Sequence, residues 1–407
     1  MTNVQPVYPP IRNKSFSSSW EKTIIEKIAQ VTSGGTPSRT NAKYWGGVIP
    51  WITTSLIDFN EITHAEEFIT SEGLTNSSAK LFPENTVLIA LYGQGVTRGR
   101  VAILRIQAAT NQACGAILFD QEKIHIPFAF YQLQAKYEKI RNIANDGGQK
   151  NLSGGLIKSL PFFTAEISEQ QKIADFLSSV DKKISQLKEK HALLQQYKKG
   201  VMQQIFTQQI RFKDDKGKAF ADWKEKPLSD LLTLTLREID KPEVNYMAIG
   251  VRSHMKGTFQ KLDFDPETIA MEKMYVVRHN DLIVNITFAW EGAIAIVKKE
   301  DDGGLVSHRF PTYTFKKGQA IHEYFRHIIS FKRFKYMLDV ISPGGAGRNR
   351  VLSKKDFLAL RWNMPCVEEQ KKIATFLGTL DTKINLVAQQ IEQTQQFKKG
   401  LLQQMFV

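Results

Sequence analysis

The chain has 407 residues, of which 42% are hydrophobic and 10% aromatic, so it can bury two ordinary hydrophobic cores and its composition argues against disorder. The chain has 55 Lys and Arg and 41 Asp and Glu, which gives a net charge of +14. About +6 of this charge lies in residues 1–208 and +8 in residues 209–407. Positive charge in both halves favours a polyanionic partner, such as duplex DNA or RNA, that both halves contact. The two cysteines lack metal-type spacing, which disfavours a zinc site or a disulfide framework. The sequence has no signal-peptide core and no apolar run long enough to span a membrane, so we predict a soluble cytoplasmic protein without membrane contact.

Residues 1–166 predict a first mixed α/β domain. An apolar segment follows Trp20, and a strand-like run occupies residues 83–90 after a polar turn. A small-residue turn then leads into another apolar strand within residues 93–103, and a glycine-rich polar loop, residues 146–153, closes the block. Short strands with frequent turns of this kind are typical of a compact mixed domain.

Residues 167–208 predict a long helix with one apolar seam. The seam residues are separated by alternating steps of four and three, the heptad spacing of a coiled coil. They include Ile173, Leu177, Val180, Ile184, Leu187 and Leu194. Residues 169–206 alone make a rod of about 57 Å at 1.5 Å per residue.

The second half repeats this plan. Residues 209–364 predict a second mixed domain that begins near Trp223, contains strand-like runs within 279–284 and 288–296, and ends in a glycine-rich loop at 343–353. Residues 365–407 then predict a second spacer helix on the same heptad steps. Its seam residues include Ile373, Leu377, Leu380, Ile384, Val387 and Ile391. The seam is interrupted by His191, Lys198, Thr394 and Lys398, which we interpret as register markers or solvated side chains without chemistry.

The two helices can pack on their own domains or on each other. Independent helices need not keep the same length and seam register, so the repeat favours mutual packing. A chain that runs domain, helix, domain, helix pairs the helices most simply in antiparallel orientation. We therefore predict an α+β protein in which two mixed α/β domains are separated by an antiparallel two-helix coiled coil with pseudo-two-fold symmetry.

Candidate nucleic-acid contacts lie beside glycines, where backbone can approach a phosphate and side chains can reach base edges. The candidates are Gln94, Thr97, Arg98, Arg100, Lys150, Asn151, Arg252, Lys256, Arg309, Arg348, Asn349 and Arg350. Asn111 and Gln112 have the same amide chemistry for pairing with adenine. The alternative is that the glycines only form turns and the basic side chains are solvated, and Arg309 can equally be a buried ion-pair partner.

One motif occurs twice, and it carries a family resemblance. Residues 169–177 read Glu-Gln-Gln-Lys-Ile-Ala-Asp-Phe-Leu, and residues 369–377 read Glu-Gln-Lys-Lys-Ile-Ala-Thr-Phe-Leu; Asp181 and Asp381 follow at the same offset. The stretches 249–253, 288–293 and 344–350 of the second block add to the likeness. The chain resembles, over essentially its whole length, the DNA-specificity subunit of a type I restriction-modification system.

The resemblance implies that the two blocks are target recognition domains, each of which reads one half of a split sequence in double-stranded DNA, while the helices fix the gap. It also implies that two methyltransferase subunits and two restriction subunits are partners. This chain would then be non-catalytic and would bind no cofactor or metal, and S-adenosylmethionine and ATP would be bound by the partner subunits.

Two other classes of protein compete with this interpretation. An enzyme that acts alone on nucleic acid is disfavoured because the sequence has no phosphate-binding loop, no dinucleotide fingerprint and no H-E-x-x-H zinc motif; His327 lies one residue too late after His322 and Glu323. A scaffold that joins two proteins would explain the helices but not the basic charge of both halves. DNA affinity that hardly changes with salt would favour the scaffold.

The glycine-rich loop of the second block yields a first prediction. If Arg348 contacts a base, Arg348→Ala weakens discrimination between target and non-target DNA by about 1 to 3 kcal/mol. Competitive binding with matched and mismatched duplexes measures this. A uniform loss of affinity for all sequences would instead place the guanidinium on phosphate.

Overall fold

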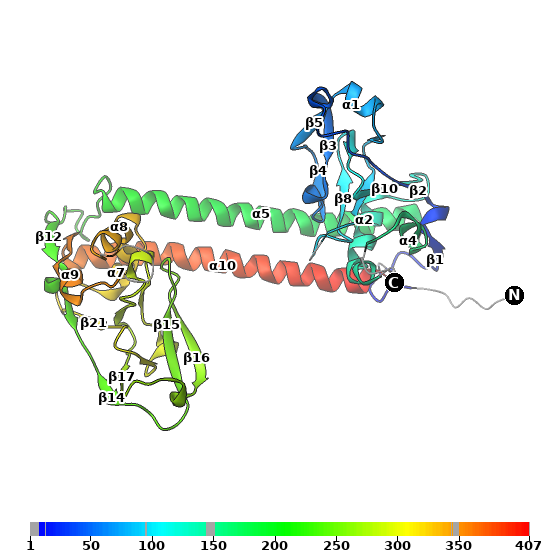
Figure 1. Cartoon of the computed structure of the whole chain (residues 1–407). Helices are drawn as coiled ribbons and strands as arrows, with labels where there is room; N and C mark the ends of the chain where they lie inside the picture. The colour runs from blue at the N-terminus through cyan, green and yellow to red at the C-terminus, as the bar shows by residue number, and fades with distance from the viewer. Residues whose placement is uncertain are drawn as a thin grey trace. The chain divides into compact units, whose positions relative to one another are not determined.

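The computed structural model describes residues 8–406 except 13, 94–95, 144–150, 343 and 345–349. The chain forms two compact units, one that contains the residues up to Glu189 together with those from Ala388 onward, and one that spans Lys190–Val387. The two long helices, α5 (Ile167–Phe206) and α10 (Val367–Met405), each contribute one part to each unit (Figure 1). The helices start at Ile167 and Val367, each two residues before its Glu-Gln pair.

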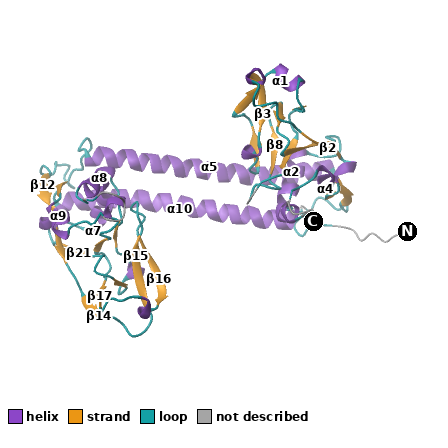
Figure 2. Ribbon diagram, in the orientation of Figure 1, coloured by secondary structure: helices purple, strands orange, loops and turns teal. Residues whose placement is uncertain are grey.

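The mixed domain of the first unit contains both strands and helices (Figure 2). One sheet has the order β2-β10-β7-β8-β4, a second has the order β5-β3-β9-β6, and β1 pairs with β11. The strands are β1 (Glu21–Ile24), β2 (Ala29–Ser33), β3 (Trp45–Ile52), β4 (Asn60–Ile62), β5 (Glu67–Ile69), β6 (Leu81–Phe82), β7 (Val87–Ala90), β8 (Val101–Leu104), β9 (Ala108–Thr110), β10 (Cys114–Phe119) and β11 (Pro161–Thr164). The helices before α5 are α1 (Ser71–Thr75), α2 (Ile126–Ala135), α3 (Tyr137–Asn142) and α4 (Gly154–Lys158).

The mixed domain of the second unit also contains two sheets and a separate pair of strands. One sheet has the order β13-β21-β18-β19, a second has the order β14-β17-β20-β15-β16, and β12 pairs with β22. The strands are β12 (Lys224–Pro227), β13 (Leu232–Leu234), β14 (Glu238–Asp240), β15 (Tyr246–Val251), β16 (Thr258–Phe264), β17 (Lys273–Val276), β18 (Leu282–Val284), β19 (Ile294–Ile296), β20 (Leu305–Val306), β21 (Thr312–Phe315) and β22 (Arg361–Met364). The helices before α10 are α6 (Leu228–Leu231), α7 (His322–Ile329), α8 (Lys332–Val340) and α9 (Lys354–Ala359).

The two domains share their strand topology. In both second sheets one strand pair is parallel, β3 with β9 in the first domain and β15 with β20 in the second. The strand that follows, β10 or β21, then crosses into the first sheet and pairs antiparallel with β7 or β18. The predicted fold class of two mixed domains is therefore confirmed, and the two domains share these strand pairings despite their unlike sequences. Among the described residues, the edge strands β4 of the first domain and β14 of the second have no counterpart in the other domain.

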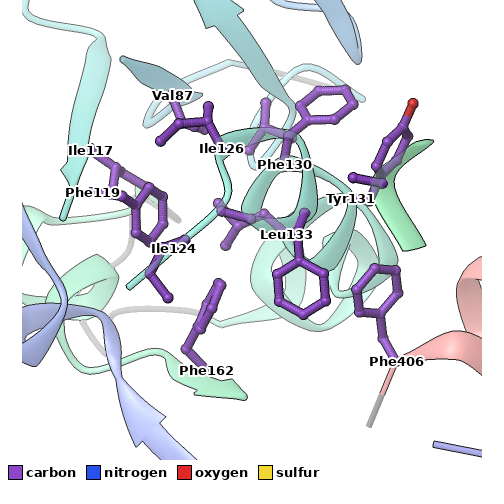
Figure 3. Close-up of a cluster of buried hydrophobic side chains, with 14 of the residues drawn as sticks. Val87, Ile117, Phe119, Ile124, Ile126, Phe130, Tyr131, Leu133, Phe162 and Phe406 are labelled. Carbon is purple, nitrogen blue, oxygen red and sulfur yellow. The ribbon is translucent and has the colours of Figure 1, made fainter. Parts of the chain in front are cut away.

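The core of the first unit lies around α2. This helix has apolar residues on all sides and seven of its ten residues are buried, as expected for a helix enclosed by other elements. The Phe128 ring packs 5.6 Å from Trp20 and 5.4 Å from Phe406, which follows the last residue of α10. Figure 3 shows Phe406 in the same buried cluster as Leu133 and Phe162. The end of α10 is thus part of the core of this unit.

Each unit contains an antiparallel pair of helix segments. In the first unit, Ile173 and Leu177 near the start of α5 share a buried cluster with Leu401 and Met405 at the end of α10. The second unit repeats the arrangement with the roles of the helices exchanged, because Ile205 of α5 packs with residues at the start of α10. The predicted antiparallel packing is confirmed, and the alternative that each helix packs only on its own domain is wrong. Of the seam residues named above, Leu194 and Ile391 are half-buried and the others are buried.

The repeated Glu-Gln pair ties each helix to the domain that precedes it. Glu169 is buried and pairs with Arg12, whose Nε lies 2.6 Å from Oε1. The Gln170 amide accepts from the backbone N–H of His125 and donates to the carbonyls of Lys123 and Ala165.

The second copy repeats these bonds. Glu369 is buried and pairs with Arg211 at 2.9 Å, and Gln370 bonds the backbone of Gln319, Ile321 and Pro365. A buried carboxylate is tolerated only when it is paired and hydrogen-bonded. The motif therefore fixes the entry angle of each helix.

The two seam lysines make ion pairs across the helices. Lys398 Nζ lies 2.7 Å from Asp181 Oδ1, and Lys198 Nζ lies 2.5 Å from Asp381 Oδ1. Polar residues in an otherwise apolar seam specify its register, because a shifted register leaves the charges unpaired. The expectation that these lysines are register markers fits this geometry, whereas Lys398 is too buried to be a solvated side chain.

The surroundings of the two aspartates differ. Tyr131 donates a hydrogen bond of 2.8 Å to Asp181, whereas His327 takes the corresponding place near Asp381, with Nδ1 4.0 Å from Oδ2. Burial is the largest effect that lowers the pKa of His327, to about 4, and the positive charge of Lys198 acts in the same direction. The negative charge of Asp381 raises the pKa, but by less. His327 is therefore neutral in the folded protein at neutral pH.

A pH dependence of stability follows from His327. His327 binds a proton near pH 6.5 in the unfolded chain but only near pH 4 in the folded chain. The stabilisation of the folded state by the neutral imidazole is therefore fully present above pH 6.5 and is lost as the pH falls, by roughly 3 kcal/mol at pH 4. We expect urea unfolding at pH 6.5 and 4 to show a steeper loss for the wild type than for His327→Leu. Equal losses in the two proteins would contradict the assignment.

Candidate nucleic-acid interface

In the first domain the candidate segments meet at the end of β7. The backbone N–H of Leu91 donates to Ala113 O at 2.8 Å, and Leu91 O accepts from Leu152 N at 3.0 Å. These two bonds bring the turn at residues 111–113 and the segment at residues 151–153 beside the loop that begins at Tyr92. Thr97, Arg98, Arg100 and Asn151 therefore come from segments that meet at this end of β7.

The two arginines of this loop already have structural partners. Arg98 Nη2 donates to Arg141 O at 2.7 Å, and Arg100 Nη1 lies 2.6 Å from Asp58 Oδ1. Gly99 has φ +83°, a conformation that side-chain-bearing residues rarely adopt, and this turn directs both arginines toward the body of the domain. That these arginines contact DNA remains a prediction. A guanidinium that contacted DNA would do so while it also makes these bonds, or would have to break them.

The second domain has the equivalent convergence at the end of β18. Ile286 N donates to Arg309 O at 3.0 Å, and Ile286 O accepts from Leu352 N at 2.9 Å. The loop at residues 252–257 joins through two further bonds of 2.9 Å, from His254 N to Glu291 O and from Met255 N to Gly292 O. Three loops of the second domain thus form one surface.

The candidate side chains on this surface fall into two groups. Lys256 and Arg309 are exposed, so the alternative that Arg309 is a buried ion-pair partner is wrong. Arg252 is also exposed, and it donates to Thr258 O at 3.1 Å. Arg350, in contrast, donates to Ser342 O and to the Asp339 carboxylate at 3.0 and 2.6 Å, so it holds the end of α8 in place. Gln94, Lys150, Arg348 and Asn349 lie outside the described residues.

Ser153 and Ser353 show how the glycine-rich loops end. Ser153 Oγ accepts from Leu156 N at the start of α4, and Ser353 Oγ accepts from Asp356 N at the start of α9. Each serine is the N-cap of a short helix, which satisfies backbone N–H groups that lack helical partners. The recurrence of this serine in the sequence therefore marks an equivalent structural position.

Beside the surface of the second domain lies an apolar cleft of about 420 Å³. Its walls include the aromatic rings of Phe259, Phe264, Phe288 and Phe310, and Glu291 adds a carboxylate that accepts from the Ser253 hydroxyl. The sequence stretches 249–253 and 288–291 meet here, although sequence analysis did not place them together. The sequence feature that could have indicated an aromatic wall is the aromatic content of residues 258–264, which form β16.

The described residues contain no group of three or more His, Cys, Asp or Glu that could hold a metal ion. Within the same part of the chain, no helix is both long and apolar enough to cross a bilayer.

Comparison with known proteins agrees with the duplicated architecture. The family described as type I restriction modification DNA specificity domain matches residues 17–196 and again residues 221–396. The chain therefore belongs to this family.

Three relatives are specificity subunits of type I restriction enzymes. The MjaIX subunit of Methanocaldococcus jannaschii is 27% identical over 226 residues, which is 52% of this chain and 51% of the relative. The EcoR124I/EcoR124II subunit of Escherichia coli is 27% identical over 164 residues, or 39% and 40% of the two chains. The match thus spans about half or less of these two relatives, whereas the MjaVIII subunit of M. jannaschii is 20% identical over 94% of this chain and 91% of its own.

Solved structures show the same fold. The type I restriction-modification S subunit from M. genitalium superimposes with a TM-score of 0.59 at 14% identity, covering 98% of this chain and 99% of the other. A chain from a structure concerned with complex assembly and conformational transition of the type I restriction-modification system gives 0.58 at 12% identity, with coverage of 94% and 96%.

The two groups of arginines yield a prediction. Arg350→Ala removes charge-assisted bonds to Asp339, so we expect a loss of about 2 kcal/mol in the free energy of unfolding. Arg309→Ala removes an exposed side chain and is expected to change stability by less than about 0.5 kcal/mol. Urea unfolding of the two variants measures both values. Equal stability losses would show that the described contacts of Arg350 contribute nothing beyond those of a surface residue.

Proposed function

We propose that this chain is the DNA sequence-recognition subunit of a type I restriction-modification complex. Each recognition domain reads one half of a bipartite target in double-stranded DNA, and the helices set the gap between the halves. The observation that carries the proposal is the match of one DNA specificity domain to both halves of the chain, joined by two helices that run without interruption through both units. The positive charge of both halves supports contact with the DNA backbone.

The length of the helices suits the proposed spacing role. At 1.5 Å per residue, the 40 residues of α5 correspond to about 60 Å, and one duplex turn is about 34 to 36 Å. A rigid rod longer than one turn can hold two readers at a defined separation along the duplex. Helix length then becomes part of the sequence specificity.

Partner subunits supply the chemistry in this proposal. Two methyltransferase subunits that bind S-adenosylmethionine and two restriction subunits that use ATP assemble on this chain, which itself is not catalytic. Apolar side chains exposed on the helices outside the seam support protein docking there, since large exposed apolar groups on a soluble protein often mark interaction sites. They include Phe176 and Phe397 in the first unit and Leu193, Tyr197 and Leu386 in the second.

An insertion tests the spacing role. One heptad added to both helices, after Glu189 and after Gln389, keeps the seam in register and lengthens the pair by about 10.5 Å, or about three base pairs. Mapping of methylated adenines in cells that carry this chain with its methyltransferase partner should show a longer gap between two unchanged half-sites.

The matched control is a seven-residue insertion in the exposed turn at residues 214–217, which lies outside both helices and should leave the gap unchanged. An unaltered gap in the heptad variant would refute the spacing role. A wild-type methylome without any bipartite motif would refute the proposed function as a whole.

A further inference from the structure

The two recognition domains present one turn in the same way. In the first domain, residues 111–113 join β9 of the second sheet to β10 of the first. In the second domain, residues 307–309 leave β20 of the second sheet and lead toward β21 of the first. Both turns therefore lie where the chain crosses between corresponding sheets.

Hydrogen bonds within the first turn define its shape. Asn111 Oδ1 accepts from Ala113 N at 3.1 Å, and Asn111 O accepts from Cys114 N at 3.2 Å. Ala113 O accepts from Leu91 N, at the end of β7. These bonds bind the residues on both sides of Gln112 to the domain, and Gln112 itself is exposed at the tip.

The second turn repeats all three bonds. Ser307 Oγ accepts from Arg309 N at 3.3 Å, and Ser307 O accepts from Phe310 N at 3.0 Å. Arg309 O accepts from Ile286 N, at the end of β18. The correspondence assigns Asn111 to Ser307 and Ala113 to Arg309, so the exposed tip residue equivalent to Gln112 is His308.

The Gln112 side chain is oriented before any ligand arrives. The Thr36 hydroxyl donates to Gln112 Oε1 at 2.6 Å, which leaves both hydrogens of Nε2 for other acceptors. The backbone at Gly34, two residues before Thr36, packs directly against β9, which leads into the turn. A Cβ on Gly34 would lie only 2.0 Å from Thr110 O. Thr36 is thus a positioning residue for Gln112.

We propose that Gln112 and His308 are equivalent base-reading residues, one for each half of the target. This inference rests on the proposed function and adds the residues that carry it out. An amide pairs with adenine by accepting from N6 and donating to N7, and an imidazole N–H donates to purine N7 or guanine O6 in the major groove. Their neighbours on the converging loops hold the tips against the duplex.

The test is methylome mapping in cells that carry the full chain with its methyltransferase partner. Gln112→Ala should relax one base position in one half-site only, with about tenfold or greater loss of discrimination at that position. His308→Ala should relax one position in the other half-site only. Thr36→Val should act on the same position as Gln112→Ala but more weakly, while thermal unfolding of all three variants stays at the wild-type temperature.

Matched controls exist in both domains. Gln30 is exposed at the far end of the pairing between β2 and β10, and His279 is exposed at the turn before β18, at the opposite end of that strand from Ile286. Gln30→Ala and His279→Ala should leave both half-sites unchanged.

The outcomes separate the inference from the proposed function. A wild-type motif in two halves that neither Gln112→Ala nor His308→Ala changes would overturn the inference and leave the proposed function standing. Loss of methylation that is uniform over all base positions would also overturn it, because phosphate contacts weaken binding without relaxing sequence. Absence of any bipartite motif in the wild type would overturn both.

Discussion

The rest of the structure depends on the antiparallel packing of α5 on α10. Each unit is completed by a segment from the distant helix: the last turns of α10 enter the core around Phe128, and the end of α5 enters the cluster around Trp362. Buried apolar area of this kind is the main source of stability in folded domains. Because the same seam residues stabilise the helix pair and the domain cores, the mixed domains and the helices fold as joined elements.

Polar contacts convert this packing into a defined geometry. The buried Glu169 and Glu369 each pair with an arginine, Arg12 or Arg211, that precedes the domain attached to the helix. The adjacent glutamines bond three backbone groups of the same domain. An ion pair of this type adds little net stability, but it excludes alternative arrangements because an unpaired buried charge is costly. The motif that repeats in the sequence therefore joins each long helix to the mixed domain that precedes it.

The sequence predicted those features that depend on periodicity and local turns. The heptad steps identified the seam, and the matching turns and strand-like runs of the two blocks identified the two mixed domains. Apart from the antiparallel pairing of the two helices, contacts between distant segments were not predictable, because periodicity does not show which segments of the chain meet. The pairing of Lys398 with Asp181, the parallel pairing of β3 with β9 and the meeting of loops at Leu91 are of this kind.

The candidate site shows the same division. The convergence of the candidate loops was not predicted, and composition could not distinguish the exposed Arg309 from Arg350, which is bonded to Asp339. His308 carries no signal of its own in the linear sequence. It emerges only when the hydrogen bonds of its turn are compared with those around Gln112.

The crossed ion pairs of the helices restrict how the molecule can change during evolution. Asp181 and Lys198 belong to α5 and pair with Lys398 and Asp381 of α10. The stretch between the aspartate and the lysine must therefore have the same length in both helices. A genetic insertion confined to one helix can preserve one pair only by separating the other. If the helices set the target spacing as proposed, new spacings are expected to arise by balanced duplications in two distant parts of the gene, and intermediates with a single lengthened helix carry a stability penalty.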